Sequence, residues 1–185
     1  MKEVVAITGK ARAGKDTIGN FLVNNYGFIK YSFADAIREI VKTAFVLSDS
    51  EVRSETLKEA PLADFPEWSV RKLLQVIGTD LFRKYIHEDI WVYNVAKRIE
   101  KNDNSRVVIT DVRFPNELDV LDTIPNARVT TIKVTRHGRD GDVGLTGHES
   151  ESYDLPTKYS ISNNVSIESL HTRINHIIQD IKLHI

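Results

Sequence analysis

Seven residues near the start of the chain have the types and the spacing of a phosphate-binding loop. The segment from Gly9 to Lys15 reads GKARAGK, which fits the G-x-x-x-x-G-K pattern. Glycines let the backbone approach an anion closely, and the start of the following helix carries a partial positive charge. We therefore expect Lys15 to reach the β- and γ-phosphates of a nucleoside triphosphate. The alternative is a strand–turn–helix that fits the pattern by accident.

The residue that follows this lysine departs from the usual pattern. Ser or Thr usually stands there to hold Mg²⁺, whereas this chain has Asp16 and then Thr17. A carboxylate is a good ligand for a hard cation, either directly or through water. It also adds negative charge beside the phosphates, so we expect the metal to matter more for this protein.

A second motif, TDVRFPNE at residues 110–117, directly follows an apolar segment. An acidic residue at the carboxyl end of a strand beside the phosphate loop is the usual position of the magnesium-linked aspartate in phosphoryl transfer. We expect Asp111 to hold Mg²⁺ through water or to orient an acceptor, and Arg113 to bridge two phosphate groups. The alternative is that Asp111 or Asn116 caps a helix.

A third motif, WSVRKLLQVIGTD at residues 68–80, combines an apolar stripe with polar residues outside it. Arg71 and Gln75 are one helical turn apart, so both can point into one cleft. The guanidinium suits a phosphate, and the amide suits the edge of a base. A solvated helix face is the alternative. Trp68 and Trp91 could stack on a base, although tryptophans more often pack in a core.

Residues 136–156 are rich in glycine and charge, which is typical of a lid that closes on phosphates. Arg136 and Arg139 are the arginines that we expect to act from this segment. His148 and Glu151 are too few to indicate a metal site.

The elements that position these motifs alternate between apolar runs and helical spacing. Strands buried on both faces read as continuous apolar runs, and helices show apolar residues three and four apart. The alternation predicts an α/β fold with a mostly parallel sheet. Strands are predicted at 4–7, 28–33, 106–110, 128–135 and 158–162, helices at 15–26, 34–47, 69–85, 88–101, 114–121 and 166–183, and a short helix with a loop at 48–68.

The composition limits the classes of function. The 185 residues suit one compact domain, and the net charge of -1 argues against a protein that coats nucleic acid. The absence of cysteine excludes disulfides and thiolate chemistry. The first apolar run is too short for a signal segment, and no stretch approaches the ~18 apolar residues of a membrane span. We expect a cytoplasmic protein without a membrane or nucleic-acid partner; a homodimer is one option that the sequence leaves open.

The chain resembles the phage-type deoxynucleoside monophosphate kinase family. The resemblance rests on GKARAGKDT, on WSVRKLLQVIGTDLFR with Trp91 downstream, on TDVRFPNE, on HESE in residues 136–156 and on ISNN near the end. These motifs follow the family order from residue 7 to about residue 170. The family has an aspartate at the position of Asp16. The segment before Trp68 is shorter than in some relatives, and relatives differ in the bases that they accept, so base preference does not carry over.

The resemblance implies a three-layer P-loop fold with a five-stranded sheet, a helical acceptor-binding region at about 48–104 and a mobile lid at about 136–156, all in one kinase domain, 1–185. It implies ATP and Mg²⁺ as cofactors, with the metal at Asp16 and Asp111. The expected catalytic residues are Lys15, Asp111 and Arg113. The expected ATP-binding residues are Gly9, Arg12, Ala13, Gly14, Lys15, Asp16, Thr17, Arg136 and Asn163. The expected residues for a deoxynucleoside monophosphate are Arg38, Arg71, Lys72, Gln75, Gly78, Thr79, Trp91 and Asp111.

The expected reaction converts ATP and a deoxynucleoside monophosphate into ADP and the diphosphate, which supplies deoxynucleotides for DNA synthesis. A kinase for another small acceptor, such as dephospho-coenzyme A or phosphomevalonate, is one alternative. A nucleotide-binding ATPase or switch without a small acceptor is another.

Overall fold

The computed structural model describes residues 1–10, 12–54, 56–136 and 154–181. The chain divides into two compact units, one formed by Met1–Ser32 with Ala96–Ile185 and the other by Phe33–Val95.

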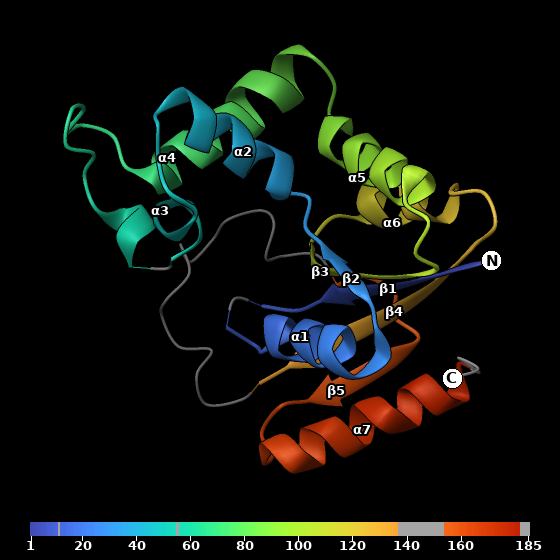
Figure 1. The fold of residues 1–185 in the computed structure, drawn as a ribbon. Coiled ribbons are helices and arrows are strands. Elements are labelled where there is room, and N and C mark those ends of the chain that lie inside the picture. The colour runs from blue at the N-terminus through green and yellow to red at the C-terminus, as the bar shows by residue number, and fades with distance from the viewer. Residues whose placement is uncertain (11, 55, 137–153, 182–185) are drawn as a thin grey trace. The chain divides into compact units, whose positions relative to one another are not determined.

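The first unit is built on a five-stranded sheet (Figure 1). Its strands are β1 (Lys2–Thr8), β2 (Ile29–Tyr31), β3 (Arg106–Val112), β4 (Ala127–Thr135) and β5 (Tyr159–Ser162). The spatial order is β2-β3-β1-β4-β5, and all four neighbouring pairs are parallel. Parallel neighbours need crossover helices, so both faces of the central strands are covered. The predicted α/β fold with a mostly parallel five-stranded sheet is confirmed.

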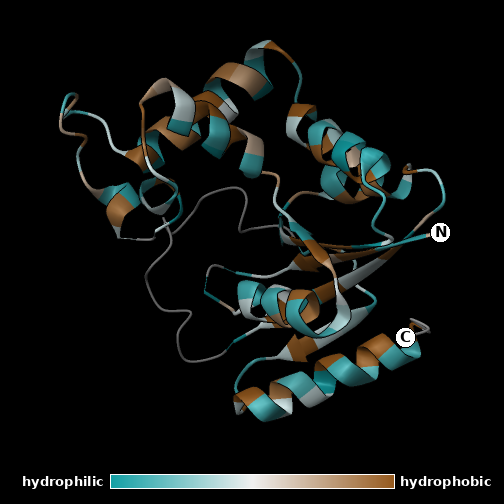
Figure 2. Ribbon diagram, in the orientation of Figure 1, coloured by the Kyte–Doolittle hydropathy of each residue, from teal (hydrophilic) through white to brown (hydrophobic). Residues whose placement is uncertain are grey.

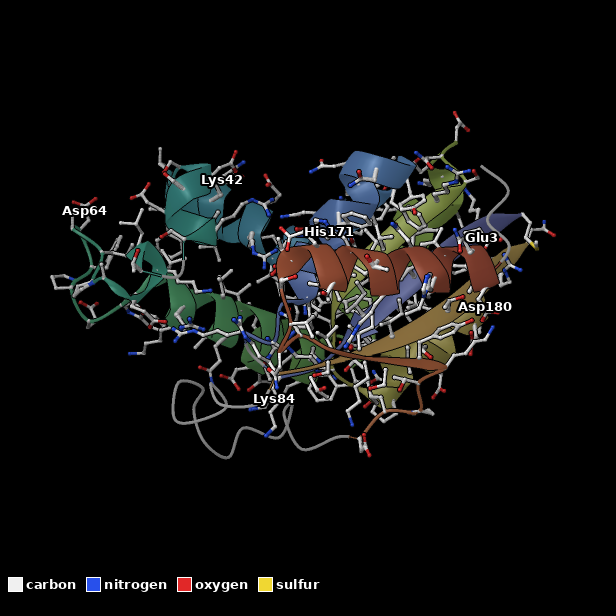
Figure 3. All side chains as sticks on the ribbon, turned by 90° about the horizontal axis from the view of Figure 1, so that it is seen from below. Glu3, Lys42, Asp64, Lys84, His171 and Asp180 are labelled. Atoms are coloured by element: carbon white, nitrogen blue, oxygen red, sulfur yellow. The ribbon has the colours of Figure 1, made fainter. Side chains whose placement is uncertain are left out.

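Helices α1 (Lys15–Tyr26) and α7 (Ile167–Asp180) contact each other and cover one face of this sheet (Figure 1). The apolar sides of both helices pack on the strands, which Figure 2 shows in brown. The ring of His171 near the start of α7 stacks on Phe21 of α1, and Asp180 ends α7 (Figure 3). Helix α6 (Pro115–Asp122) contacts β4 and shares no residue with the core beneath α1 and α7.

The second unit is helical. It contains α2 (Asp35–Ala44), α3 (Asp49–Arg53), a 3₁₀ turn η1 (Leu57–Glu59), α4 (Val70–Gln75), a π-helix η2 (Val76–Arg83) and the first residues of α5 (Ile90–Lys101), which ends in the first unit. Its small core is formed by Val41, Val52, Val70 and Leu73.

The predicted helix at 69–85 is confirmed, because residues 70–85 are helical, but after Gln75 it widens into the π-helix η2. The buried indole N–H of Trp91 donates to the carbonyl oxygen of Gly78, 2.8 Å away, inside this segment. A Cβ on Gly78 would lie 2.8 Å from the Cδ1 atom of Ile37. These contacts join residues that are distant in sequence. Apolar spacing reports only which face of a helix is buried, so it does not reveal the π-helix.

No helix among the described residues has both the length and the apolar character that crossing a bilayer requires.

The carboxyl ends of the parallel strands meet at one edge of the sheet. Thr8 ends β1, Val112 ends β3 and Thr135 ends β4. In parallel α/β sheets ligands bind outside this edge. The phosphate loop and the TDVRFPNE motif therefore lie at the same edge of the sheet.

Candidate active site

The loop between β1 and α1 has the backbone of a phosphate cradle. Gly9 and Gly14 have φ angles of 143° and 103°, which side chains other than hydrogen rarely permit. A Cβ on Gly9 would lie 2.3 Å from the carbonyl oxygen of Val134 in β4. Arg12 has a φ of 60°, which is uncommon for a residue other than glycine. The backbone conformation of the loop therefore requires glycine at both positions of the motif, independently of any ligand.

Asn163, just after β5, holds this loop from the other side. Its side-chain amide donates to the carbonyl oxygen of Ala13 at 2.8 Å, and its backbone N–H donates to Thr135 at 2.7 Å. A Cβ on Gly14 would lie 2.2 Å from the Nδ2 atom of Asn163. Asn163 is therefore brought to the phosphate loop, and its role in ATP binding stays a prediction.

The ammonium group of Lys15 lies against the loop that precedes it. Its Nζ atom donates to the carbonyl oxygens of Gly9 at 2.7 Å and Lys10 at 2.8 Å. Arg12 and Thr17 are exposed beside it. A positive side chain, a helix start and a glycine-framed loop coincide here, which is the arrangement that binds phosphate groups.

Asp16 makes two side-chain contacts within the first unit. Its Oδ1 atom accepts from Lys30 Nζ of β2 at 2.6 Å and from Thr110 Oγ1 of β3 at 3.0 Å. Burial raises the pKa of this carboxyl group, but the hydrogen bond and the charge of Lys30, with the Thr110 hydroxyl and the charge of Lys15, together hold the pKa below its usual value. Asp16 is therefore ionised at neutral pH and can serve as a metal ligand.

The sequence predicted that Asp111 directly follows a strand. In the structure Asp111 lies within the last residues of β3. Ala6 of β1 pairs with Ile109 and Thr8 pairs with Val112, so β3 has one extra residue at Thr110–Asp111. Such a bulge changes the direction of side chains and is common beside active sites. The hydroxyl of Ser32, which directly follows β2, donates to Asp111 Oδ2 at 2.5 Å. Asp111 is thus oriented from a neighbouring strand.

The α6 cap differs from the predicted alternative, in which Asp111 or Asn116 caps the helix. Phe114 is the N-cap residue, and Pro115 opens the helix. Buried Glu117 accepts from the backbone N–H groups of Arg113 at 2.6 Å and Phe114 at 3.0 Å. Both bonds end on Oε2. This carboxylate fixes the backbone from which the exposed Arg113 side chain extends.

Of the residues discussed for the predicted lid, the structure describes only Arg136. Arg136 is half-buried and directly follows β4. Arg139, His148 and Glu151 lie outside the described residues, as does most of the predicted lid.

Two carboxylates at the sheet edge suit a divalent cation that completes its coordination with water and substrate phosphates. The described residues contain no group of three or more His, Cys, Asp or Glu side chains that could hold a metal ion. Asp16 contacts Thr110, and Asp111 is the next residue of β3, so the two carboxylates belong to one edge of the sheet. Mg²⁺ is commonly held by one or two carboxylates together with water and substrate phosphates.

In the second unit, Arg71 and Gln75 are exposed on α4, as their positions outside the apolar stripe predicted. The guanidinium of Arg71 pairs with Glu59 of η1. Lys72 donates to the carbonyl oxygen of Glu67 at 3.2 Å, and its ammonium lies 4.4 Å from the centroid of the Trp68 ring. These three polar side chains thus come from one short helix.

Trp91 is a packed residue of the second unit. It is 7% exposed, and its ring lies 4.9 Å from that of Phe82. The carbonyl oxygen of Gly78 accepts a hydrogen bond from the indole N–H of Trp91. Gly78 is buried, and Thr79 is exposed. Trp91, Gly78 and Thr79 are therefore adjacent around η2, and contact between them and an acceptor stays a prediction.

Arg38 on α2 is half-buried. It donates to Asp35 Oδ1 at 3.0 Å, and Arg53 lies 3.6 Å from the same oxygen. One carboxylate therefore holds two arginines of the second unit.

The structure thus divides the predicted site. The residues expected for ATP belong to the first unit, and those expected for the acceptor belong to the second, apart from Asp111. That Lys15 and Arg71 face each other across a cleft stays a prediction.

Sequence reasoning missed Lys30, Ser32 and the capping role of Glu117. Only Glu117 had a readable signal, because it stands two residues after a proline in TDVRFPNE, where a capping carboxylate is common. Lys30 and Ser32 carry no local signal. Their partners lie 14 and 79 residues away.

Comparisons with known proteins agree with the geometry. The family model for deoxynucleotide monophosphate kinase matches residues 3–64 and 52–174. The chain is similar to a protein of Acanthamoeba polyphaga mimivirus assigned as a deoxynucleotide monophosphate kinase, with 32% identity across 92% of this chain and 93% of that protein. It is also similar to the deoxynucleoside-5'-monophosphate kinase of Escherichia phage T5, with 38% identity across 49% of this chain and 36% of that protein.

Among solved structures, a sugar kinase from a Janibacter species has a similar fold. The TM-score is 0.54 at 15% identity, across 100% of this chain and 96% of that one. The family match covers most of the chain, and its residues include the phosphate loop and the TDVRFPNE motif. The chain belongs to the deoxynucleotide monophosphate kinase family.

Proposed function

We propose that this protein transfers the γ-phosphoryl group of ATP to the phosphate of a deoxynucleoside monophosphate, giving ADP and the diphosphate. The observation that carries the proposal is the glycine-framed loop with the Lys15 ammonium against it, in a chain of this family. The similarity to relatives named for this activity supports the choice of acceptor.

The chain's own groups provide positioning and charge rather than a nucleophile. The attacking atom is a phosphate oxygen of the acceptor, so no side chain needs to form a covalent intermediate. Lys15 and the loop N–H groups bind the β- and γ-phosphates, and Arg113 stabilises the negative charge that passes between the nucleotides. Arg136 and the predicted lid of about residues 136–156 exclude water.

Mg²⁺ completes this site in the proposal, with Asp16 and Asp111 as its protein ligands, directly or through water. When bound, it supplies charge neutralisation and alignment of the phosphates. Lys30, Thr110 and Ser32 hold the two carboxylates in place.

The second unit supplies the acceptor-binding groups in this proposal. Arg38 and Arg71 suit the acceptor phosphate, and Gln75 suits its base, because an amide both donates and accepts. In this proposal Trp91, which packs against Phe82 and is 7% exposed, forms a wall of the site and does not stack on the base. Lys72, Gly78 and Thr79 complete the set. The region at about 48–104 acts with the rest of 1–185 as one kinase; a cytoplasmic location and a homodimer stay predictions.

The test is ADP formation with ATP and Mg²⁺ against four deoxynucleoside and four ribonucleoside monophosphates. We expect ADP to form only with an acceptor and faster with deoxynucleotides. Replacing Lys15 with alanine should lower kcat/KM by about 10²–10³-fold, the usual loss of one key electrostatic contact. Lys97→Ala, which removes an exposed lysine of α5, is the matched control.

Two results would contradict the proposal. One is ATP hydrolysis at the same rate with and without every acceptor. The other is turnover only with dephospho-coenzyme A or phosphomevalonate.

A further inference from the structure

Asp16 presents an electrostatic problem that the phosphate loop has to solve. It stands directly after Lys15, where a hydroxyl is usual, and its side chain is 75% exposed. An ionised carboxylate there repels the phosphates that the loop binds. A neighbouring positive charge would remove most of that repulsion.

Lys30 is that charge. Its Nζ atom lies 2.6 Å from Asp16 Oδ1 and 3.2 Å from Asn20 Oδ1, and its side chain is 31% exposed. Lys30 comes from β2 and reaches the first turn of α1 from the neighbouring strand. Thr110 donates to the same Asp16 oxygen. The carboxylate is therefore held between an ammonium group and a hydroxyl group.

Helix α1 leaves room for Thr110, the second partner of Asp16. Gly19 stands in the middle of this helix, although glycine weakens a helix interior. A Cβ on Gly19 would lie 2.4 Å from Thr110 Cγ2 and 3.8 Å from the Cδ and Cε atoms of Lys30. The missing side chain makes room for Thr110, whereas Lys30 lies at an ordinary contact distance from this position. Stability alone does not explain this arrangement, because a partly exposed ion pair contributes little to folding.

We propose that Lys30 is a positioning residue that offsets the charge of Asp16 and so allows a carboxylate beside the nucleotide phosphates. This inference rests on the proposed function only in placing a nucleotide at the loop. Lys30 acts through Asp16 and not on the reacting atoms. Its loss should therefore matter only while the carboxylate is present.

The test is a double-mutant cycle on the affinity for ADP, measured by calorimetry with EDTA so that no metal contributes. Lys30→Met should weaken ADP binding about tenfold, the size of one partly screened charge interaction. Asp16→Asn alone should tighten ADP binding, because it removes the repulsive charge. In the Asp16→Asn background, Lys30→Met should change the affinity less than about twofold. Lys30→Arg, which keeps the charge, should stay close to wild type.

A merely structural role for Lys30 gives a different pattern. Equal weakening by Lys30→Met in both backgrounds would overturn the proposal, as would weaker metal-free binding by Asp16→Asn alone. Lys97→Met controls for net charge, and thermal unfolding of each variant reports folding. If Lys30→Met does not fold, Lys30→Gln replaces it and the Asp16→Asn arm still decides. A wild type that binds ADP but phosphorylates no deoxynucleotide contradicts the proposed reaction and leaves this cycle measurable.

Discussion

Replacing Glu117 with alanine should destabilise the fold and slow phosphoryl transfer together. The carboxylate is 7% exposed, and its Oε2 atom accepts from the backbone N–H groups of Arg113 and Phe114. Hydrogen bonds to an ionised group contribute about 1.5–3 kcal/mol each, and water recovers part of this when the acceptor is lost. We expect a loss of about 2–4 kcal/mol in the free energy of unfolding. For a chain of this size that lowers Tm by about 5–15 °C.

Glu117→Gln refines this prediction, because a single Oε2 atom accepts both bonds. An amide oxygen can accept the same two backbone bonds without the assistance of the charge, so we expect a smaller loss of stability than for the alanine variant. Asp119→Ala removes an exposed carboxylate from the same helix and is the matched control. Urea unfolding gives the stability, and the coupled assay should show a lower kcat with little change in KM for ATP. An alanine variant as stable as the Asp119 control would refute the reasoning.

Three further predictions concern the edge of the sheet. Asn163→Ala should raise KM for ATP about tenfold, because it frees the loop carbonyl of Ala13, while the preference for ATP over GTP stays constant; a changed preference would instead indicate contact with the base. Ser32→Ala should lower kcat about tenfold by releasing Asp111, with an unchanged KM for ATP in the same assay. The pKa of Asp16 lies below its model-compound value of 3.8, so its contribution to stability is present above that pH and is lost as the pH falls through the lower folded value. Thermal unfolding between pH 7 and pH 3 should therefore show a smaller decline for Asp16→Asn than for wild type.

The first unit could be predicted from the sequence because its signals are local. The helix that begins at Lys15 and ends before Gly27 has the predicted bounds, since the glycine takes a left-handed φ of 67° that stops the helix. The buried strands are continuous apolar runs, and their alternation with helices determines a parallel sheet. The backbone of the loop between β1 and α1 requires glycine at two positions. The G-x-x-x-x-G-K pattern therefore identifies the same loop as the fold does.

The features that were not predicted depend on partners that no local pattern reveals. The π-helix η2 holds a buried contact between Gly78 and Trp91, which are 13 residues apart. The extra residue of β3 at Thr110–Asp111 appears only when the strand is paired with β1, where Ala6 pairs with Ile109 and Thr8 pairs with Val112. Apolar spacing reports which face of an element is buried and carries no information on backbone pairing, so it indicates neither feature.

The two carboxylates of the sheet edge each accept a hydrogen bond from a hydroxyl group. Thr110 donates a hydroxyl hydrogen bond to Asp16, and Ser32 donates one to Asp111. A hydroxyl fixes the direction of a carboxylate without adding charge, so the charge stays available to a cation. Asp16 also has the ammonium group of Lys30 as a partner, and it adjoins the lysine of the phosphate loop. The sequence thus combines a hydroxyl for orientation with Lys30 for charge where phosphate and carboxylate compete, which is why the departure at Asp16 is compatible with a working nucleotide site.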